Sequence, residues 1–107
     1  MGLLDLLKQR DINVWLEEFK ETKNAVLLDV RTIEEVREER IPGSINIPLD
    51  EINSVANKIP DKSTPLFVHC FSGARSGRAV DSLKKMGYTN ATNIGGISSY
   101  KGEVERG

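Results

Sequence analysis

The sequence contains only one cysteine, Cys70, and only one histidine, His69, among its 107 residues. A single thiol cannot form an internal disulfide, and such cysteine usage is typical of a reducing, cytoplasmic setting. One cysteine and one histidine are also too few for a Cys/His metal cluster. We therefore predict a cytoplasmic protein that needs no metal and no other cofactor.

Net charge is also nearly absent, because 15 Lys and Arg residues stand against 16 Asp and Glu residues. No basic stripe and no alternation of basic with aromatic residues is present, so we expect no nucleic-acid partner. No apolar run reaches the length of a membrane span, and we expect no association with a membrane. The apolar start of the chain, residues 1–7, is too short for a secretory signal and lacks its basic beginning.

The length of the chain allows one domain with a core of its own, without disulfides. We predict a single domain over residues 1–107, with residues 1–10 as an N-terminal extension and residues 101–107 as a mobile C-terminal tail. The leucine-rich extension fits either a helical turn or an added flap.

Residues 65–87 are predicted to form a strand, a loop and a helix, and the other predicted elements are arranged around them. The run at residues 66–68 (LFV) is apolar, short and preceded by turn residues, which predicts a buried strand. Further along, apolar residues recur at helical spacing until Gly87, which predicts a helix that ends at a C′ glycine. Cys70 therefore lies where a strand ends and a helix begins.

Strands and helices alternate along the rest of the chain. Further strands are predicted at residues 25–30, 45–47 and 91–94. Helices are predicted from the cap at residue 13 to about residue 20, from residue 33 to about residue 39, and after Asp50, where the helix contains Ile52, Val55 and Ile59. The expected N-terminal caps of these helices are Asn13, Thr32 in a capping box with Glu35, and Asp50. This alternation predicts an α/β fold with a mostly parallel central sheet of about five short strands and helices on both faces.

The loop at residues 70–76 (CFSGARS) has the composition of an anion cradle. Its backbone N–H groups and the helix that follows attract negative charge, so the pKa of the Cys70 thiol should fall below about 8.5. A lone cysteine after a buried strand is often only a small core residue. The flexible Gly73, the hydroxyls of Ser72 and Ser76, and the charge of Arg75 favour a reactive thiolate instead.

In parallel sheets, ligands bind beyond the carboxyl ends of the strands. Four residues fall at such ends, and we expect one pocket to collect them: Asp29, Arg31, Cys70 and Gly95.

Taken together, these segments resemble a single-domain rhodanese from about residue 13 to residue 100. The matching segments are residues 28–31 (LDVR), 41–48 (IPGSINIP), 70–76 (CFSGARS), 87–88 (GY) and 95–96 (GG). The resemblance implies the three-layer rhodanese-like fold and a sulfurtransferase. In that reaction Cys70 accepts a sulfane sulfur from a donor such as thiosulfate or a persulfide, and passes it to cyanide, a thiol or a protein.

The resemblance also implies roles for the residues around the catalytic cysteine. The loop that holds the persulfide consists of Phe71, Ser72, Gly73, Ala74, Arg75 and Ser76. We expect Arg75 to brace this loop, with a clamp on a substrate oxyanion as the alternative. Asp29 and Arg31 are expected to support the site, with direct substrate contact as the alternative. In this role Asp29 accepts hydrogen bonds from neighbouring loops, and Arg31 pairs with a carboxylate such as Glu35 or Glu38.

Two positions depart from the rhodanese pattern. A basic residue often follows the cysteine and helps to bind thiosulfate, whereas this chain has Phe71, which favours an apolar or protein-bound sulfur donor. Arg40 stands where the family has the histidine of Gly-His-Ile-Pro-Gly, and we expect it to alter local packing while activity is kept.

Two other classes remain alternatives. One is a cysteine phosphatase, whose loop has five residues between its cysteine and its arginine. Only four residues separate Cys70 from Arg75. The shorter loop fits a single sulfur atom better than a tetrahedral phosphate. A non-catalytic or sulfur-carrying rhodanese-like module is the other alternative, although non-catalytic modules usually lose the cysteine. We expect His69 to be structural, because adjacent side chains on a strand point to opposite faces.

Overall fold

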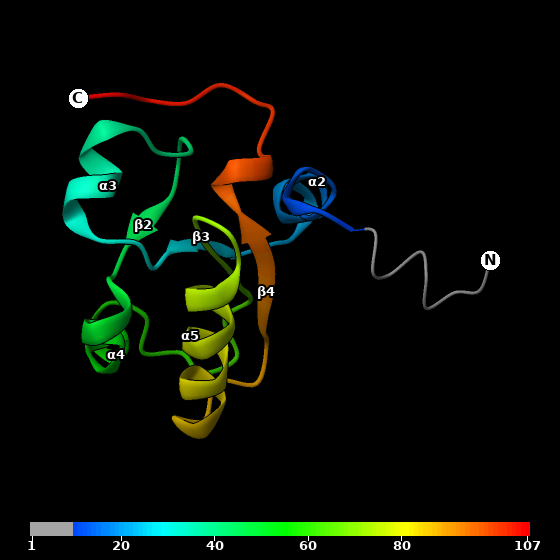
Figure 1. The fold of residues 1–107 in the computed structure, drawn as a ribbon. Helices are drawn as coiled ribbons and strands as arrows, with labels where there is room; N and C mark the ends of the chain where they lie inside the picture. The colour runs from blue at the N-terminus through cyan, green and yellow to red at the C-terminus, as the bar shows by residue number, and fades with distance from the viewer. Residues whose placement is uncertain (1–9) are drawn as a thin grey trace.

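A computed structural model describes residues 10–107 (Figure 1). The turn or flap that was predicted in the leucine-rich extension falls almost wholly on residues 1–9, outside the described residues. Within residues 10–107, no helix is both long enough and apolar enough to cross a membrane.

Four short strands form one parallel sheet in the order β2-β1-β3-β4. In chain order the elements are α2 (Ile12–Glu21), β1 (Val26–Asp29), α3 (Ile33–Glu38), β2 (Ile45–Asn46), the 3-10 helix η1 (Leu49–Ser54), α4 (Val55–Lys58), β3 (Leu66–Cys70), α5 (Ala74–Lys85), β4 (Ala91–Gly96) and the 3-10 helix η2 (Ile97–Ser99). The predicted α/β fold is confirmed, with four strands in place of about five.

Side chains from alternate positions of the strands enter two separate hydrophobic cores. One core joins the sheet to α5, α4 and η1, and its buried residues include Leu28, Ile52, Val55, Val68, Ala79 and Leu83. The other joins the opposite face to α2 and η2, and includes Ile12, Leu16, Leu27, Phe67, Ile94 and Ile97. Helices therefore cover both faces of the sheet (Figure 1).

Two predicted helix ends are confirmed. Thr32 and Glu35 form the capping box at the start of α3, with reciprocal bonds between each side chain and the other residue's backbone. Gly87 follows the C-cap of α5 with a φ of +101°, a left-handed conformation that favours glycine.

The predicted cap of α2 is wrong, because Asp11 occupies the N-cap position. Its carboxylate accepts hydrogen bonds from the N–H groups of Asn13 at 3.0 Å and Val14 at 3.3 Å. The side chain of Asn13 instead bonds to the Ser99 carbonyl at 2.8 Å and the Lys101 N–H at 2.9 Å. Asn13 therefore ties the chain after η2 to α2.

The single helix predicted after Asp50 is also wrong. The segment begins as η1, directly after Pro48, and the backbone of Glu51 leaves the helical region before α4 starts. Ile52, Val55 and Ile59 are nevertheless buried, as their spacing predicted. The apolar period was therefore identified correctly, while the choice between 3-10 and α hydrogen bonding was not.

Residues 101–107, expected to be a mobile tail, hydrogen-bond to the chain around α3. Arg40 and Glu105 exchange two backbone hydrogen bonds of 2.9 Å as an antiparallel bridge, and the Gly107 N–H donates to the Arg37 carbonyl at 3.0 Å.

The Tyr88 hydroxyl provides a test of the first core. Tyr88 is 2% exposed, and its hydroxyl donates to the backbone carbonyl of Ile59. Tyr88→Phe should lower the free energy of unfolding by about 1–3 kcal/mol, because a buried carbonyl loses its partner. Urea unfolding measures this loss. In the matched control Tyr100→Phe, the lost bond to the Glu103 carbonyl is exposed and should cost about 0.5 kcal/mol or less. Equal losses would contradict the prediction.

Candidate active site

Cys70 is the last residue of β3 and is only 1% exposed. The chain then turns back over its sulfur through a loop that ends on the first turn of α5. The Gly73 N–H lies 3.0 Å from Sγ, the Ser76 N–H 3.4 Å, and the Ser76 Oγ 3.4 Å. Gly73 has a φ of +104°, a left-handed conformation that lets the loop close tightly around the sulfur.

Two opposing effects set the pKa of the Cys70 thiol. Burial raises this pKa, because it disfavours the charged thiolate. Hydrogen bonds from the Ser76 hydroxyl and from the N–H groups of Ser76, Gly73 and Ser72 outweigh burial and hold the pKa below its usual value. The expected amide cradle is therefore built by three of the six residues that follow Cys70.

The other loop residues have different positions. Ala74 opens α5, while the Phe71 carbonyl accepts a hydrogen bond from the Ser98 N–H at 3.0 Å. The Phe71 side chain is 52% exposed. Its backbone lies so close to β4 that a Cβ on Gly96 would come within 1.9 Å of the Phe71 oxygen. Only glycine at position 96 permits this approach.

Asn93 on β4 joins this loop to the sheet, although nothing in the sequence distinguished it. Its Nδ2 donates to the Gly73 carbonyl at 3.0 Å. Its Oδ1 accepts from the Ser76 hydroxyl at 2.7 Å and from the Gly95 N–H at 3.0 Å. Because Asn93 lies 20 residues beyond Gly73, only the β3–β4 pairing reveals its place.

Arg75 is held by Glu35 of α3 in a two-pronged ion pair, with N–O distances of 2.7 and 2.9 Å. The bond from Arg75 lowers the pKa of Glu35 to about 2, and the same pair raises the pKa of Arg75. This geometry supports the bracing role and commits the guanidinium to a carboxylate of the protein.

Arg31 does not pair with Glu35 or Glu38, contrary to the prediction. Its Nη2 lies 2.8 Å from Asp29 Oδ2, its Nε bonds to both oxygens of that carboxylate, and Nη2 also donates to the Glu39 carbonyl at 2.9 Å. Glu35 is already occupied by Arg75, and Asp29 is the nearest carboxylate along the chain.

Asp29 is fully buried between Arg31 and His69. Burial raises the pKa of Asp29, but interactions with His69 and Arg31 outweigh it and lower the pKa to about 2. His69 Nε2 lies 3.4 Å from the Asp29 carboxylate. His69 is thus beside Asp29, while the next residue, Cys70, belongs to the core on the α5 face.

Arg40 lies beside the C-terminal segment. Its guanidinium donates to the carbonyls of Val36 and Gly107, each at 3.3 Å, and lies 3.5 Å from the Glu105 carboxylate. Within residues 10–107, no hydrogen bond or ion pair links its side chain to the loop of Cys70. The effect of Arg40 on local packing and on activity stays a prediction.

The single pocket predicted at the strand ends is divided in two. Arg31 and Phe71 line a cavity of about 260 Å³, and Gly95 lines another of about 330 Å³ with Ser72 and Gly73. Neither is lined by Cys70 or Asp29, because the loop covers the sulfur and Arg31 covers the carboxylate.

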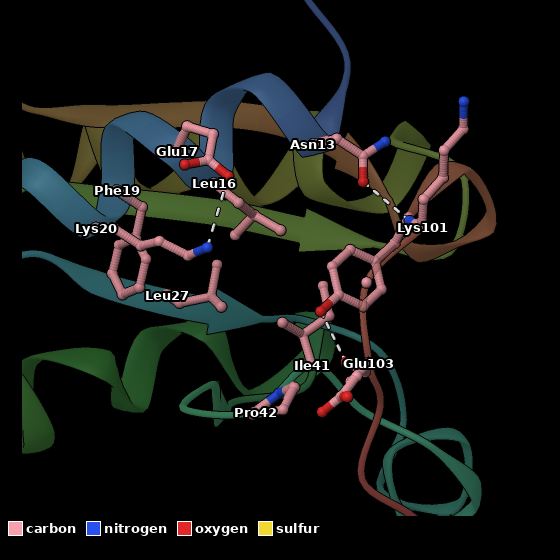
Figure 2. Close-up of a pocket in the computed structure, with 12 residues that line it drawn as sticks. Asn13, Leu16, Glu17, Phe19, Lys20, Leu27, Ile41, Pro42, Lys101 and Glu103 are labelled. Carbon is pink, nitrogen blue, oxygen red and sulfur yellow. Dashed lines mark hydrogen bonds and ion pairs between the residues drawn. The ribbon is translucent and has the colours of Figure 1, made fainter.

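Another cavity, of about 570 Å³, lies against α2 and the segment that follows η2 (Figure 2). Leu16, Phe19, Leu27 and Ile41 give it an apolar lining. It contains no thiol and no histidine, and it borders the core opposite to that of Cys70. The residues that line this cavity therefore include no nucleophile comparable to Cys70.

Comparison with known proteins agrees with this geometry. A family model described as Rhodanese-like domain matches residues 13–103. The chain belongs to the rhodanese-like domain family. This confirms the family that the sequence motifs indicated.

Individual members of the rhodanese-like family can be compared in more detail. The chain is 42% identical over 71 residues to "Thiosulfate sulfurtransferase PspE" of Escherichia coli, covering 65% of this chain and 68% of that protein. It is 35% identical over 95 residues to "Putative sulfur carrier protein YrkF" of Bacillus subtilis, covering 84% of this chain and only 51% of that protein. A solved structure titled "rhodanese with anions from E. coli" is 37% identical, with a TM-score of 0.72, covering 78% of this chain and 99% of that one.

The pair of Arg75 and Glu35 predicts a pH dependence of stability. The Glu35 pKa falls from its ordinary 4.5 to about 2 in the folded protein, so the pair stabilises the fold above pH 4.5 and loses its effect between pH 4.5 and 2. In Glu35→Gln, the free energy of unfolding should therefore change less between pH 4.5 and pH 2 than in the unmodified protein. Glutamine preserves the capping box, so the start of α3 is kept.

Urea unfolding at several pH values between 2 and 6 measures this difference. The stabilities of the two proteins should approach each other toward pH 2. Glu34→Gln, on the exposed side of the same helix, is the matched control and should follow the unmodified protein. Parallel curves for Glu35→Gln and the unmodified protein would show that the ion pair contributes nothing.

Proposed function

We propose that this rhodanese-like protein is a cytoplasmic sulfurtransferase. It moves a sulfane sulfur from thiosulfate or a persulfide to a thiophilic acceptor through a persulfide on Cys70. The observation that carries the proposal is the convergence of the Gly73 and Ser76 N–H groups and the Ser76 hydroxyl on Sγ. These donors favour the thiolate, which is the nucleophilic form of cysteine.

The reaction consists of two displacements at sulfur. The Cys70 thiolate attacks the outer sulfur of the donor, a new S–S bond forms, and the old bond breaks with its electron pair on sulfite or on a thiolate. Cyanide, a thiol or a protein thiol then attacks the outer sulfur of the Cys70 persulfide. With cyanide the products are thiocyanate and the original Cys70 thiolate. Sulfur changes carrier, and no external oxidant or reductant is consumed.

The loop supplies the electrostatic part of the reaction. The outer sulfur of the persulfide carries negative charge, which inward N–H groups and the N-terminus of the 12-residue helix α5 stabilise. The same donors serve the thiolate before transfer and the persulfide after it. A small change in the position of the charge therefore requires little rearrangement of the protein.

The surroundings of the loop favour a persulfide donor over thiosulfate. Arg31 is bonded to Asp29, and Arg75 is bonded to Glu35, so each guanidinium is committed to a carboxylate. The half-exposed Phe71 adds apolar surface where a basic residue would attract an oxyanion. A donor that leaves as a thiolate, small or protein-bound, fits this environment better than one that leaves as sulfite.

A sulfur carrier is the second candidate. The near-complete burial of Cys70 favours it, since a covered persulfide is protected from small acceptors, and a relative bears the name of a putative sulfur carrier. A carrier would load once and release its sulfur only to a partner protein. Repeated turnover with cyanide distinguishes the sulfurtransferase from the carrier.

Sulfur loading tests the proposed function. Incubation of the protein with glutathione persulfide or thiosulfate should add the mass of one sulfur atom to Cys70, and cyanide should remove it. Intact-mass spectrometry records both steps. Cys70→Ala should accept no sulfur and should remain folded, because the change in buried volume is small.

Three results would contradict the proposal. They are loading that persists in Cys70→Ala, the absence of any adduct from either donor, and hydrolysis of para-nitrophenyl phosphate without sulfur loading. The last result would favour the phosphatase alternative.

Phe71→Arg tests the donor preference. An added guanidinium beside the loop should lower the KM for the dianion thiosulfate several-fold, and should lower the KM for a singly charged alkyl persulfide less. Steady-state kinetics with both donors measure the two effects. Phe71→Leu is the matched control, because it preserves an apolar side chain without adding charge. An unchanged or higher KM for thiosulfate in Phe71→Arg would refute the role of this position.

A further inference from the structure

We infer that Asn93 is a positioning residue that holds Gly73 and Ser76 against Cys70 Sγ and controls which acceptor receives the Ser76 hydrogen. Asn93 does not touch the sulfur. It contacts two of the three residues whose backbone N–H groups donate to the sulfur, through the Gly73 carbonyl at 3.0 Å and the Ser76 hydroxyl at 2.7 Å. The inference rests on the proposed function only in that Cys70 is taken as the reactive group.

The hydrogen-bond network determines the orientation of the Asn93 amide. Nδ2 faces the Gly73 carbonyl, and Oδ1 faces the Gly95 N–H, each at 3.0 Å. Turning the amide over would place oxygen against oxygen and N–H against N–H. Oδ1 is therefore the atom that meets the Ser76 hydroxyl.

The Ser76 hydroxyl has a single hydrogen and three acceptors within reach: Asn93 Oδ1 at 2.7 Å, and Cys70 Sγ and the Gly95 carbonyl, each at 3.4 Å. The shortest of these contacts is the one to Asn93. In the thiol form, Cys70 S–H can donate to Ser76 Oγ across 3.4 Å, while Ser76 donates to Asn93 Oδ1 across 2.7 Å. The thiolate has no hydrogen to give, so Ser76 must turn its own hydrogen toward Sγ. Asn93 Oδ1 then keeps the Gly95 N–H as a donor. Ionisation of Cys70 therefore leaves both Sγ and Asn93 Oδ1 with a donor from the protein, which keeps its cost low.

Charged groups also surround this network, and they act separately from it. On one side are Arg75 on α5, its partner Glu35 on α3, and Asp29 and Arg31 at the end of β1, with His69 beside Asp29. On the other side, Arg10 and Asp11 before α2 line the same cavity as Asn93, Gly73 and Gly95. Within residues 10–107, none of them hydrogen-bonds to Ser76 or Asn93. An effect of the neutral Asn93 amide on the thiol therefore passes through Ser76 and Gly73, whereas a charge placed at residue 93 also acts on the thiolate directly.

Asn93→Asp tests this role with almost no change in shape. A carboxylate cannot donate to the Gly73 carbonyl, and its charge retains the Ser76 hydrogen and disfavours a thiolate nearby. The pH midpoint of Cys70 alkylation by iodoacetamide should rise, so that the alkylation rate at pH 7 falls about tenfold. In a Ser76→Ala background the same substitution should have less than half of this effect. The matched control is Asn90→Asp, an exposed position just before β4, which should leave the midpoint unchanged.

A second measurement needs no variant of Asn93. In the unmodified protein, the amide resonance of Gly95 should titrate with the same midpoint as Cys70 alkylation, because Oδ1 loses the Ser76 hydrogen there. In Ser76→Ala this titration should disappear.

An unchanged midpoint in Asn93→Asp, an equal effect in the Ser76→Ala background, or a Gly95 titration that survives without Ser76 would overturn the inference. Alkylation requires no sulfur donor. A failure of the proposed sulfurtransferase activity would therefore appear in the loading experiment and not here.

Discussion

The hydrogen bonds that converge on Cys70 Sγ are the interaction on which the site depends. The sulfur is almost fully buried, and burial alone would keep it as a neutral, inert thiol. Donors from Ser72, Gly73 and Ser76 reverse that preference. The loop therefore combines exclusion of solvent with stabilisation of negative charge, the two conditions under which a persulfide is both protected and reactive.

Four elements from distant parts of the chain hold these donors in place. β4 supports the loop through Asn93 and through the close approach at Gly96, while α3 supports it through the ion pair of Glu35 with Arg75. β3 delivers the cysteine, and α5 continues the loop into a helix with its N-terminus toward the sulfur. The geometry around one atom thus depends on two strands and two helices.

The sequence predicted what is local in this arrangement. The strand, loop and helix around Cys70 are contiguous, and so is the capping box of Thr32 and Glu35, so residue spacing was sufficient. The pairings of Arg75 with Glu35 and of Ser76 with Asn93 join residues 40 and 17 positions apart. They depend on strand order and register, which one sequence does not specify. The prediction of one helix after Pro48 was wrong for another reason. A 3-10 turn and an α turn bury the same apolar residues and differ little in energy, so the spacing of apolar residues does not distinguish them.

The central claim is that hydrogen bonding outweighs burial at Cys70. The absorbance of the thiolate near 240 nm, followed against pH and corrected with Cys70→Ala, measures this balance directly. A midpoint clearly below the ordinary cysteine value of about 8.5 is the predicted result. A midpoint at or above that value would contradict the account, because the cradle would then fail to stabilise the charge it surrounds.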